Sequence, residues 1–206
     1  MTEIQIYNTA ALDREEWRHL QAISRDGFSA TLDRPQDKID ALVEWNDFAD
    51  YYESHVDPNY AVGKSYNPNQ SYSKPRVAIA TDGSKVVGFA YSAHNVSGTT
   101  ERERTLKRLS VVKNYLWLRE VAVASGYQGQ GIARELGKAL LNDAIPLQPP
   151  TAYVWPGEIP FLQGSLEKLG FSQTDEQESV IYGPNSIPVR EVRMQATSAK
   201  AVLKSL

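Results

Sequence analysis

An apolar strand that runs straight into a glycine-bearing turn and then a helix restricts the fold of this chain more than any other feature. Residues 111–123 have the apolar, branched composition of a buried strand. The turn after it carries Gly129 and Gly131, and residues 131–144 then place apolar side chains at helical spacing. The sequence therefore predicts a strand–turn–helix unit, which is typical of folds that combine helices with a sheet.

The turn of this unit has the chemistry of an anion site. Glycine has no Cβ, so backbone N–H groups can point into the turn without a side chain in the way. The first turn of a helix leaves its N–H groups unpaired and carries a partial positive charge, so it can bind a phosphate without a lysine. The residues predict a site for a phosphate, in particular a diphosphate, and leave open a turn that binds no ligand.

Two other glycine-rich phosphate motifs do not fit the spacing. The dinucleotide motif G-x-G-x-x-G/A, started at Gly129, meets Arg134 where a glycine or alanine is required. The nucleotide-binding loop G-x-x-x-x-G-K-[ST], started at Gly131, finds Gly137 one residue too late and Ala139 where a hydroxyl is required. If the turn binds a phosphate, it therefore belongs to a different class of phosphate site.

The whole chain predicts a mixed sheet with helices. Alternation and turn residues indicate strands at residues 3–7, 76–81, 85–95, 111–123, 151–155, 171–182 and 188–196. Helical spacing and capping residues indicate helices at residues 13–25, 35–55, 131–144 and 161–169. For the first of these, Asp13 with Glu16 three residues later predicts a capping box. Long connections are expected at residues 57–75 and 97–108, and a short tail at 197–206 that is either a small helix or frayed. We expect one domain, 1–206, with an α/β (α+β) fold: a mostly antiparallel sheet of about seven strands and about four helices.

Composition excludes several classes of function. The 206 residues contain no cysteine, and the three histidines lack the spacing of metal ligands, so we expect no metal site. A net charge of -3 does not favour nucleic-acid binding. No apolar run approaches the roughly 20 residues of a membrane span. The first residues, acidic and alternating, do not resemble a signal peptide, so we expect a cytoplasmic protein.

Two motifs carry a family resemblance. Gln128-x-x-Gly131-x-Ala133, entered from an apolar strand, resembles the acyl-CoA signature Q/R-x-x-G-x-G/A of the GNAT superfamily of N-acetyltransferases. The segment from Leu166 to Phe171 is similar to the phrase Y-x-K-L-G-F that often closes a helix in that family. The resemblance covers about residues 76–182. It implies an acyl-CoA N-acyltransferase fold whose sheet is splayed between the fourth and fifth strands to admit coenzyme A.

The resemblance also implies how this chain would hold acetyl-CoA, its cosubstrate, without a metal. Backbone N–H groups of the turn would bind the pyrophosphate, namely those of Gly129, Gln130, Gly131, Ile132 and Ala133. Gln128 would shape the turn, and Arg134 would reach a phosphate. Backbone groups of Val121 and Val123 would pair with the pantetheine arm in the way that an added strand does.

For catalysis the resemblance points to Glu120, on the central strand beside the expected thioester. A carboxylate there would act as the base that deprotonates the attacking amine. A backbone N–H of Val121 or Val123 would stabilise the tetrahedral oxyanion. The alternative is a structural carboxylate that pairs with Arg119 or Arg76.

The expected general acid departs from the family pattern. The tyrosine that frequently protonates the leaving thiolate in this family is replaced by Leu166. Ser165, Tyr153 and Tyr182 stay open as substitutes. A thiolate is a tolerable leaving group, so this departure bears on the mechanism more than on the function.

The acceptor side is expected in residues 13–75, because the early helices and their loop wall the acceptor pocket in this family. Residues 33–57 carry eight acidic side chains against two basic ones, and aromatic residues are frequent in the same region. A solvated helix face and a packed core explain them without a ligand. A field of carboxylates would also attract a cationic amine. His55 and His94 are expected to be structural.

The leading hypothesis is a transferase that moves an acetyl or other acyl group from coenzyme A to an amine of a small molecule or peptide. Its rival is a catalytically silent module that binds or senses acyl-CoA, which the missing tyrosine favours. A structural or adaptor domain without ligand is the third hypothesis. We expect no nucleic-acid or membrane partner, and the sequence leaves both a monomer and a homodimer open.

Overall fold

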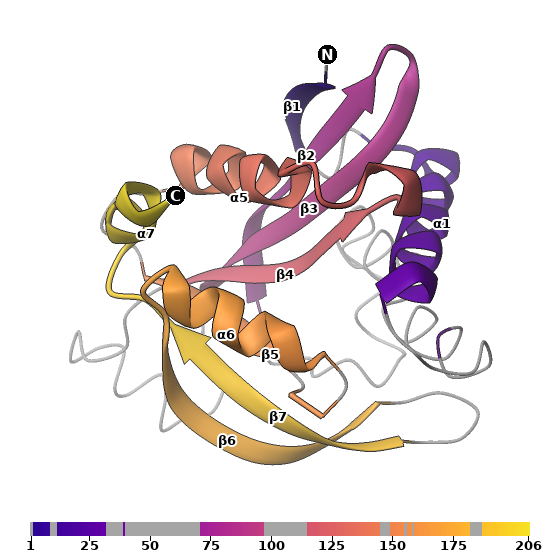
Figure 1. The fold of residues 1–206 in the computed structure, drawn as a ribbon. Coiled ribbons are helices and arrows are strands. Elements are labelled where there is room, and N and C mark those ends of the chain that lie inside the picture. The colour runs from indigo at the N-terminus through magenta and orange to yellow at the C-terminus, as the bar shows by residue number, and fades with distance from the viewer. Residues whose placement is uncertain are drawn as a thin grey trace.

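The chain forms a seven-stranded sheet with helices packed against it, as the computed structural model shows (Figure 1). The structure describes residues 2–8, 12–31, 39, 71–96, 115–144, 149–154, 156–157, 159–181 and 187–206. The strands are β1 (Thr2–Asn8), β2 (Ser71–Asp82), β3 (Lys85–Val96), β4 (Tyr115–Val123), β5 (Pro150–Val154), β6 (Ser172–Ile181) and β7 (Ile187–Gln195). The helices are α1 (Arg14–Thr31), α5 (Ile132–Asp143), α6 (Pro160–Lys168) and α7 (Ala199–Ser205), with a short 3₁₀ turn η3 (Ser125–Tyr127).

The sheet is antiparallel except at one place. Its strand order is β1-β2-β3-β4-β5-β7-β6, and only the neighbours β4 and β5 run parallel. The chain passes from β4 to β5 through α5, which is the crossover connection that parallel neighbours need. The predicted fold class, a mixed and mostly antiparallel α/β fold, is confirmed.

The strands β4 and β5 pair over only part of their length. Three residue pairs join them, and the last pair is Leu118 with Ala152. Tyr153 and Val154 continue β5 but pair only with β7, whereas β4 continues to Val123 along β3. Within the described residues the two strands therefore diverge after Leu118, at the place where the splay was predicted.

One face of the sheet is covered by α1. Its apolar side chains join those of β2, β3 and β4 in a buried cluster: Leu12, Trp17, Leu20, Ile23, Val77, Ile79, Phe89, Tyr91 and Ala122. The rings of Trp17 and Tyr91 meet edge-on with 6.1 Å between their centroids. This cluster fixes α1 over the strand that precedes the glycine turn.

The start of α1 follows the predicted capping pattern, but its end does not. The N–H of Glu16 donates to Asp13 Oδ1 at 2.9 Å, and the N–H of Asp13 donates to Glu16 Oε2 at 2.8 Å, which is a reciprocal capping box. The helix continues to Thr31, beyond the predicted end near Arg25. Gly27 lies in the added part of the helix, where it is buried against β4, and this packing stabilises the longer helix.

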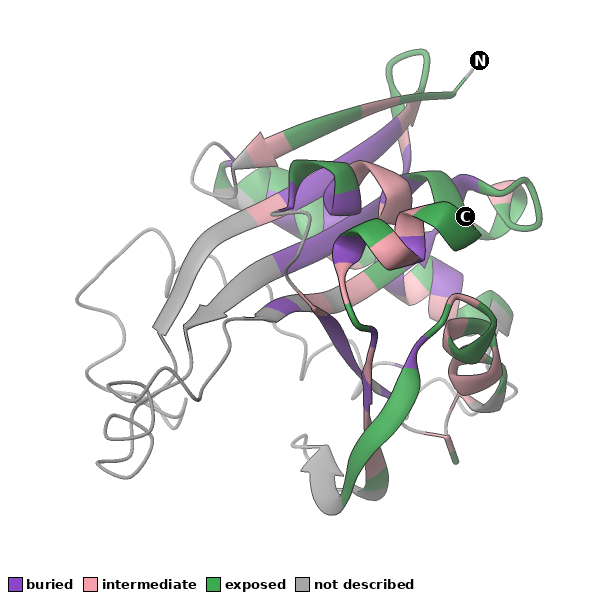
Figure 2. Ribbon diagram, turned by 90° about the vertical axis from the view of Figure 1, so that its left-hand side faces the viewer, coloured by how far each residue is buried: buried purple, intermediate pink, exposed green. Residues whose placement is uncertain are grey.

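The opposite face of the sheet is covered by α5. The buried side chains of α5, Ile132, Leu136 and Leu140, sit at helical spacing. Small residues of β2 and β3 meet them, namely Ala78, Ala80 and Ala90. Figure 2 shows the buried residues gathered in the central strands and the exposed ones along β1 and the first half of β6.

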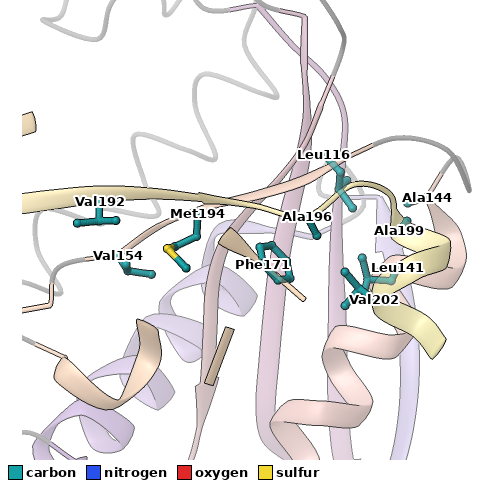
Figure 3. Packing of buried hydrophobic residues seen from close by; sticks show 10 residues of the cluster. All are labelled: Leu116, Leu141, Ala144, Val154, Phe171, Val192, Met194, Ala196, Ala199 and Val202. Carbon is teal, nitrogen blue, oxygen red and sulfur yellow. The ribbon is translucent and has the colours of Figure 1, made fainter. Parts of the chain in front are cut away.

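A third buried cluster joins β5, β7 and the ends of α5 and α7 (Figure 3). It contains Leu116, Leu141, Ala144, Val154, Phe171, Val192, Met194, Ala196, Ala199 and Val202. Of the two forms expected for residues 197–206, the structure has the small helix, which packs against this cluster. The N–H of Ala201 donates to the hydroxyl of Ser198 at 3.1 Å, and this bond caps α7.

The predicted loop at residues 57–75 is wrong at its end. The strand β2 begins at Ser71, five residues before the predicted start at Arg76, because Ser71 pairs with Val96 at the far end of β3. A partner strand supplies hydrogen bonds that no local pattern reveals. The predicted helix at 35–55, apart from residue 39, and the predicted connection at 97–108 lie outside the described residues.

Candidate coenzyme A site

The turn between β4 and α5 is built on two glycines in the left-handed region. Gly129 has a φ of 77°, and Gly131, the N-cap of α5, has a φ of 81°. Residues with a Cβ rarely adopt this conformation. A Cβ added at either glycine would meet nothing within 4 Å. The outer surface of the turn is therefore open, and the glycines serve the path of its backbone rather than tight packing.

The backbone N–H groups of residues 129–134 form a row of donors at the start of α5. Within the described part of the chain, none of them donates to another backbone group. The hydrogen bonds of α5 begin with the N–H of Glu135, which donates to the carbonyl of Gly131 at 3.1 Å. Orphan donors at the positive end of a helix dipole are what an anion needs, so these residues fit a pyrophosphate.

The side-chain amide of Gln128 holds the turn in place. Its Nε2 donates to the carbonyl oxygens of Gly27 and Val123, each at 3.1 Å. One bond ties the turn to the end of β4, and the other ties it to α1. This is the arrangement that a residue shaping the turn would have. It also makes the carbonyl of Val123, a predicted partner of the pantetheine arm, an acceptor within the protein itself.

The strand β4 carries a bulge beside the predicted thioester position. Its register against β3 skips Arg119 between Leu118 and Glu120. A bulge bends a strand and redirects the side chains next to it. Directly after it, Val121 is 45% exposed although it lies on a central strand. The exposed Val121 thus lies in the part of β4 that does not pair with β5, where a pantetheine arm was predicted to pair.

Glu120 lies on the face of β4 that α1 covers. The hydroxyl of Ser24, a residue of α1 that is only 1% exposed, donates to Oε1 of Glu120. Of the two arginines considered as its partners, Arg76 forms an ion pair with Asp143 of α5 at 3.0 Å. The side chain of Arg119 lies outside what the structure describes. The role of Glu120 as a base stays a prediction.

Arg134 lies in the first turn of α5, next to the row of donors. Its guanidinium donates to the main-chain oxygen of Leu206, just after α7. A contact between Arg134 and a phosphate, as predicted, would have to replace or share this bond. The phosphate role of Arg134 therefore stays a prediction.

The residues considered for the general acid are only partly described. Leu166, which replaces the tyrosine of the family motif, packs against the third buried cluster. Ser165 is exposed, and its hydroxyl donates to the carbonyl of Phe161 at 2.8 Å, within its own helix. The side chains of Tyr153 and Tyr182 lie outside the described residues.

A comparison with protein families decides the assignment. The model of the acetyltransferase (GNAT) family matches residues 39–148, more than half of the chain. This chain belongs to the GNAT acetyltransferase family. The match contains β4, the glycine turn and α5, so the resemblance drawn from the sequence motifs is confirmed. Membership of the family supports the binding of coenzyme A and the transfer of an acyl group from it. No curated protein matches the sequence.

Solved structures share the GNAT fold with this chain at low sequence identity. A protein assigned to the GNAT family from Desulfovibrio desulfuricans has a TM-score of 0.56 and 12% identity, over 96% of this chain and 99% of that one. The GCN5-related N-acetyltransferase of Rhodopseudomonas palustris has a TM-score of 0.55 and 15% identity, over 96% of each chain. The PaiA N-acetyltransferase of Thermoplasma acidophilum, solved in complex with coenzyme A, has a TM-score of 0.51 and 14% identity, over 95% and 99%. At this identity the comparisons establish the fold alone.

The sequence analysis did not identify Ser24 and Asp26, two polar residues that the structure places at the candidate site. Ser24 falls on the apolar face of α1, one turn after Leu20, and a polar residue on such a face was the signal that could have marked it. The sequence holds no comparable signal for Asp26, which is exposed on α1. Both residues meet partners near the turn that lie about a hundred positions further along the chain.

Two further properties concern only the described ranges. None of the helices there is long and apolar enough to cross a bilayer. No group of three or more histidine, cysteine or acidic side chains gathers there in a way that could hold a metal ion.

Proposed function

We propose that this protein transfers an acetyl group from acetyl-CoA to an amine of a small molecule or peptide. The observation that carries the proposal is the row of orphan N–H donors at residues 129–134, next to the diverging edge of β4. The donors suit the pyrophosphate, and the strand edge suits the pantetheine arm. Coenzyme A supplies the thioester that is attacked.

The proposed chemistry asks for one proton acceptor and one oxyanion donor. An ammonium group must lose a proton before its nitrogen can attack the thioester carbon, and Glu120 is the proposed acceptor. A backbone N–H of Val121 or Val123 is the proposed donor to the oxyanion. Attack forms the new C–N bond and the tetrahedral intermediate, and collapse of this intermediate breaks the C–S bond. The nitrogen gives up its second proton, and the thiolate of coenzyme A takes up one proton from a group that we do not assign.

An amine is the favoured acceptor because of the acidic charge around residues 33–57. Eight carboxylates in that segment would draw a cation toward the enzyme. The segment lies outside the described residues except for residue 39, so the argument rests on its composition alone. The same composition makes a cationic metabolite or a lysine-bearing peptide the first acceptors to try.

A silent acyl-CoA-binding module is the second candidate. Leu166 favours it, since this apolar side chain packs into the protein and cannot protonate a thiolate. The bond between Ser24 and Glu120 speaks against it, because a buried hydroxyl that orients a carboxylate is more than binding alone requires.

An assay of thiol release separates the two candidates. The protein is incubated with acetyl-CoA and a panel of polyamines, aminoglycosides, amino acids and lysine peptides, and free thiol is followed over time. We expect amine-dependent release together with an acetylated amine of matching amount in the mass spectrum. Tight coenzyme binding without release on any amine would instead establish the silent module.

A substitution in the first turn of α5 tests the coenzyme site directly. Ala133→Asp places a carboxylate among the predicted pyrophosphate donors, while an acid at this position favours the helix. We expect it to weaken the binding of coenzyme A at least tenfold, equivalent to about 1.4 kcal/mol, in a calorimetric titration. Ala133→Asn is the matched control without the charge, and its affinity should fall less. Equal affinity of the aspartate variant and the unaltered protein would remove the pyrophosphate from this turn.

A further inference from the structure

The last turns of α1 contact the turn between β4 and α5, here called the coenzyme turn, through their backbone. A Cβ on Gly27 would lie 2.8 Å from the carbonyl oxygen of Val123, so the helix and the end of β4 touch without a side chain between them. The carbonyl of Gly27 also accepts a hydrogen bond from Gln128. In Figure 1, α1 stands beside the point where β4 passes into the turn.

A carboxylate of α1 completes this attachment. Oδ2 of Asp26 accepts a hydrogen bond from the N–H of Ser125 at 2.6 Å, and Oδ1 accepts one from the Ser125 hydroxyl at 3.1 Å. Hydrogen bonds to an ionised acceptor are roughly twice as strong as neutral ones. Both bonds hold Ser125, the first residue of η3, where the chain leaves β4 and begins the turn.

The negative charge of Asp26 indicates that this residue orients the backbone and does not itself attract the coenzyme. An acid close to an anion site repels the anion, so electrostatics alone would select against a carboxylate here. Asp26 engages the N–H of Ser125, which precedes the row at residues 129–134 and is not one of its donors. The carboxylate thus accepts from an N–H group outside the predicted pyrophosphate donors. It orients the backbone that leads to those donors.

We propose that Asp26 is a positioning residue of the coenzyme A site, acting through Ser125. The inference rests on the coenzyme-binding part of the proposed function. It makes α1, the first helix on the acceptor side, a structural part of the coenzyme site. Loss of the carboxylate loosens the turn before residue 129, and coenzyme A must then order it on binding.

The experiment compares Asp26→Ala with Asp26→Asn. Alanine removes both bonds, whereas asparagine keeps an acceptor for the Ser125 N–H and removes the negative charge. We expect the alanine variant to bind coenzyme A about tenfold more weakly. We expect the asparagine variant to bind within about threefold of the unaltered protein. In steady state the alanine variant should raise KM for acetyl-CoA and change kcat little, since the reacting groups are untouched.

Glu135→Gln is the control for charge alone. Glu135 is an acid in the first turn of α5. Its side chain accepts a hydrogen bond from Lys138, and its contact with the turn, a bond from its N–H to the carbonyl of Gly131, is made by the backbone and is kept in the variant. Its neutralisation should leave the affinity for coenzyme A unchanged or slightly tighter. Circular dichroism and thermal melting establish that each variant is folded before its affinity is compared.

The outcomes distinguish this inference from the function on which it rests. A folded Asp26→Ala variant with unaltered affinity overturns the positioning role, and so does an asparagine variant as weak as the alanine one. Either result leaves the coenzyme site itself intact. If the unaltered protein binds no coenzyme A, the proposed function falls and this inference falls with it.

Discussion

Ser24 of α1 and Glu120 of β4 form a side-chain hydrogen bond at the predicted reaction centre. A serine inside a helix can satisfy its hydroxyl on its own backbone, one turn earlier. Ser24 instead donates across to the strand carboxylate, and it is buried while doing so. Its hydroxyl therefore orients a group on β4 rather than serving α1.

Glu120→Gln tests the role of the carboxylate as the base. Glutamine keeps the size and can still accept from Ser24, but it cannot take a proton from the amine. We expect kcat to fall by roughly 10²–10⁴ while the affinity for acetyl-CoA stays nearly unchanged. A near-normal kcat with the true acceptor would mean that Glu120 is structural and that the amine arrives already deprotonated.

Ser24→Ala tests whether the hydroxyl acts through that carboxylate. Alone, the substitution should lower kcat about tenfold, because the carboxylate loses an oriented donor. Introduced into Glu120→Gln, it should cost little more, since residues that act as a unit are not additive. Ser24→Thr keeps the hydroxyl and should restore part of the rate. Equal losses in both backgrounds would show that the two residues act independently.

At the scale of elements, the close approach of α1 to the end of β4 depends on Gly27, which has no side chain. Glycine within a helix costs roughly 0.5–1 kcal/mol relative to alanine, yet Gly27 lies within α1. Its place against the Val123 carbonyl explains it, because any larger residue would push the helix from the strand. The coenzyme turn, fastened to the same helix end, would move with it.

Gly27→Ala is expected to destabilise the fold by about 1–3 kcal/mol, as forced overpacking does. Gly137→Ala is the matched control, since Gly137 lies within α5 and a Cβ there meets nothing within 4 Å. That control should be stabilised by roughly 0.5–1 kcal/mol. Urea denaturation gives both values. A Gly27→Ala protein as stable as the control would show that α1 does not need this close approach.

At the scale of the whole molecule, the sheet has few residue pairs at one place, the seam between β4 and β5. In the described part of the chain, three residue pairs join β4 to β5, whereas β2 and β3 pair along most of their length. The third buried cluster holds the two sides together through Leu116 of β4 and side chains of β5 and β7. A pantetheine arm that pairs with the edge of β4 would add contacts at this seam.

Coenzyme A is therefore expected to stabilise the folded protein. A ligand at a hundredfold excess over its Kd adds about 2.7 kcal/mol. For a chain of this size that corresponds to an increase in Tm of about 5–11 °C, measurable by differential scanning fluorimetry. Ala133→Asp should abolish most of the shift at the same concentration. An unchanged Tm at saturating coenzyme A would contradict binding to the native state.

The sequence by itself determined the parts of this protein that depend on neighbours in the chain. The spacing of Gln128, Gly131 and Ala133 predicts the turn, and the capping box predicts the start of α1. Gly170 closes α6 with a φ of 85°, as its place in the closing motif predicts. The local hydrogen bonds of these features join residues close in the chain, such as Asp13 with Glu16 and Gln128 with Val123, so a short window of sequence contains both partners.

Only the tertiary structure decided which distant residues meet at the site. Ser24 reaches Glu120 and Asp26 reaches Ser125 across 96 and 99 positions, because α1 packs on the strand that precedes the turn. The long β2 depends in the same way on pairing with β3, at positions where its own residues show no strand pattern. Such contacts follow from the order of strands in the sheet and the face that each helix covers. A local pattern of side chains cannot encode them, since each partner is chosen by the packing of the whole fold.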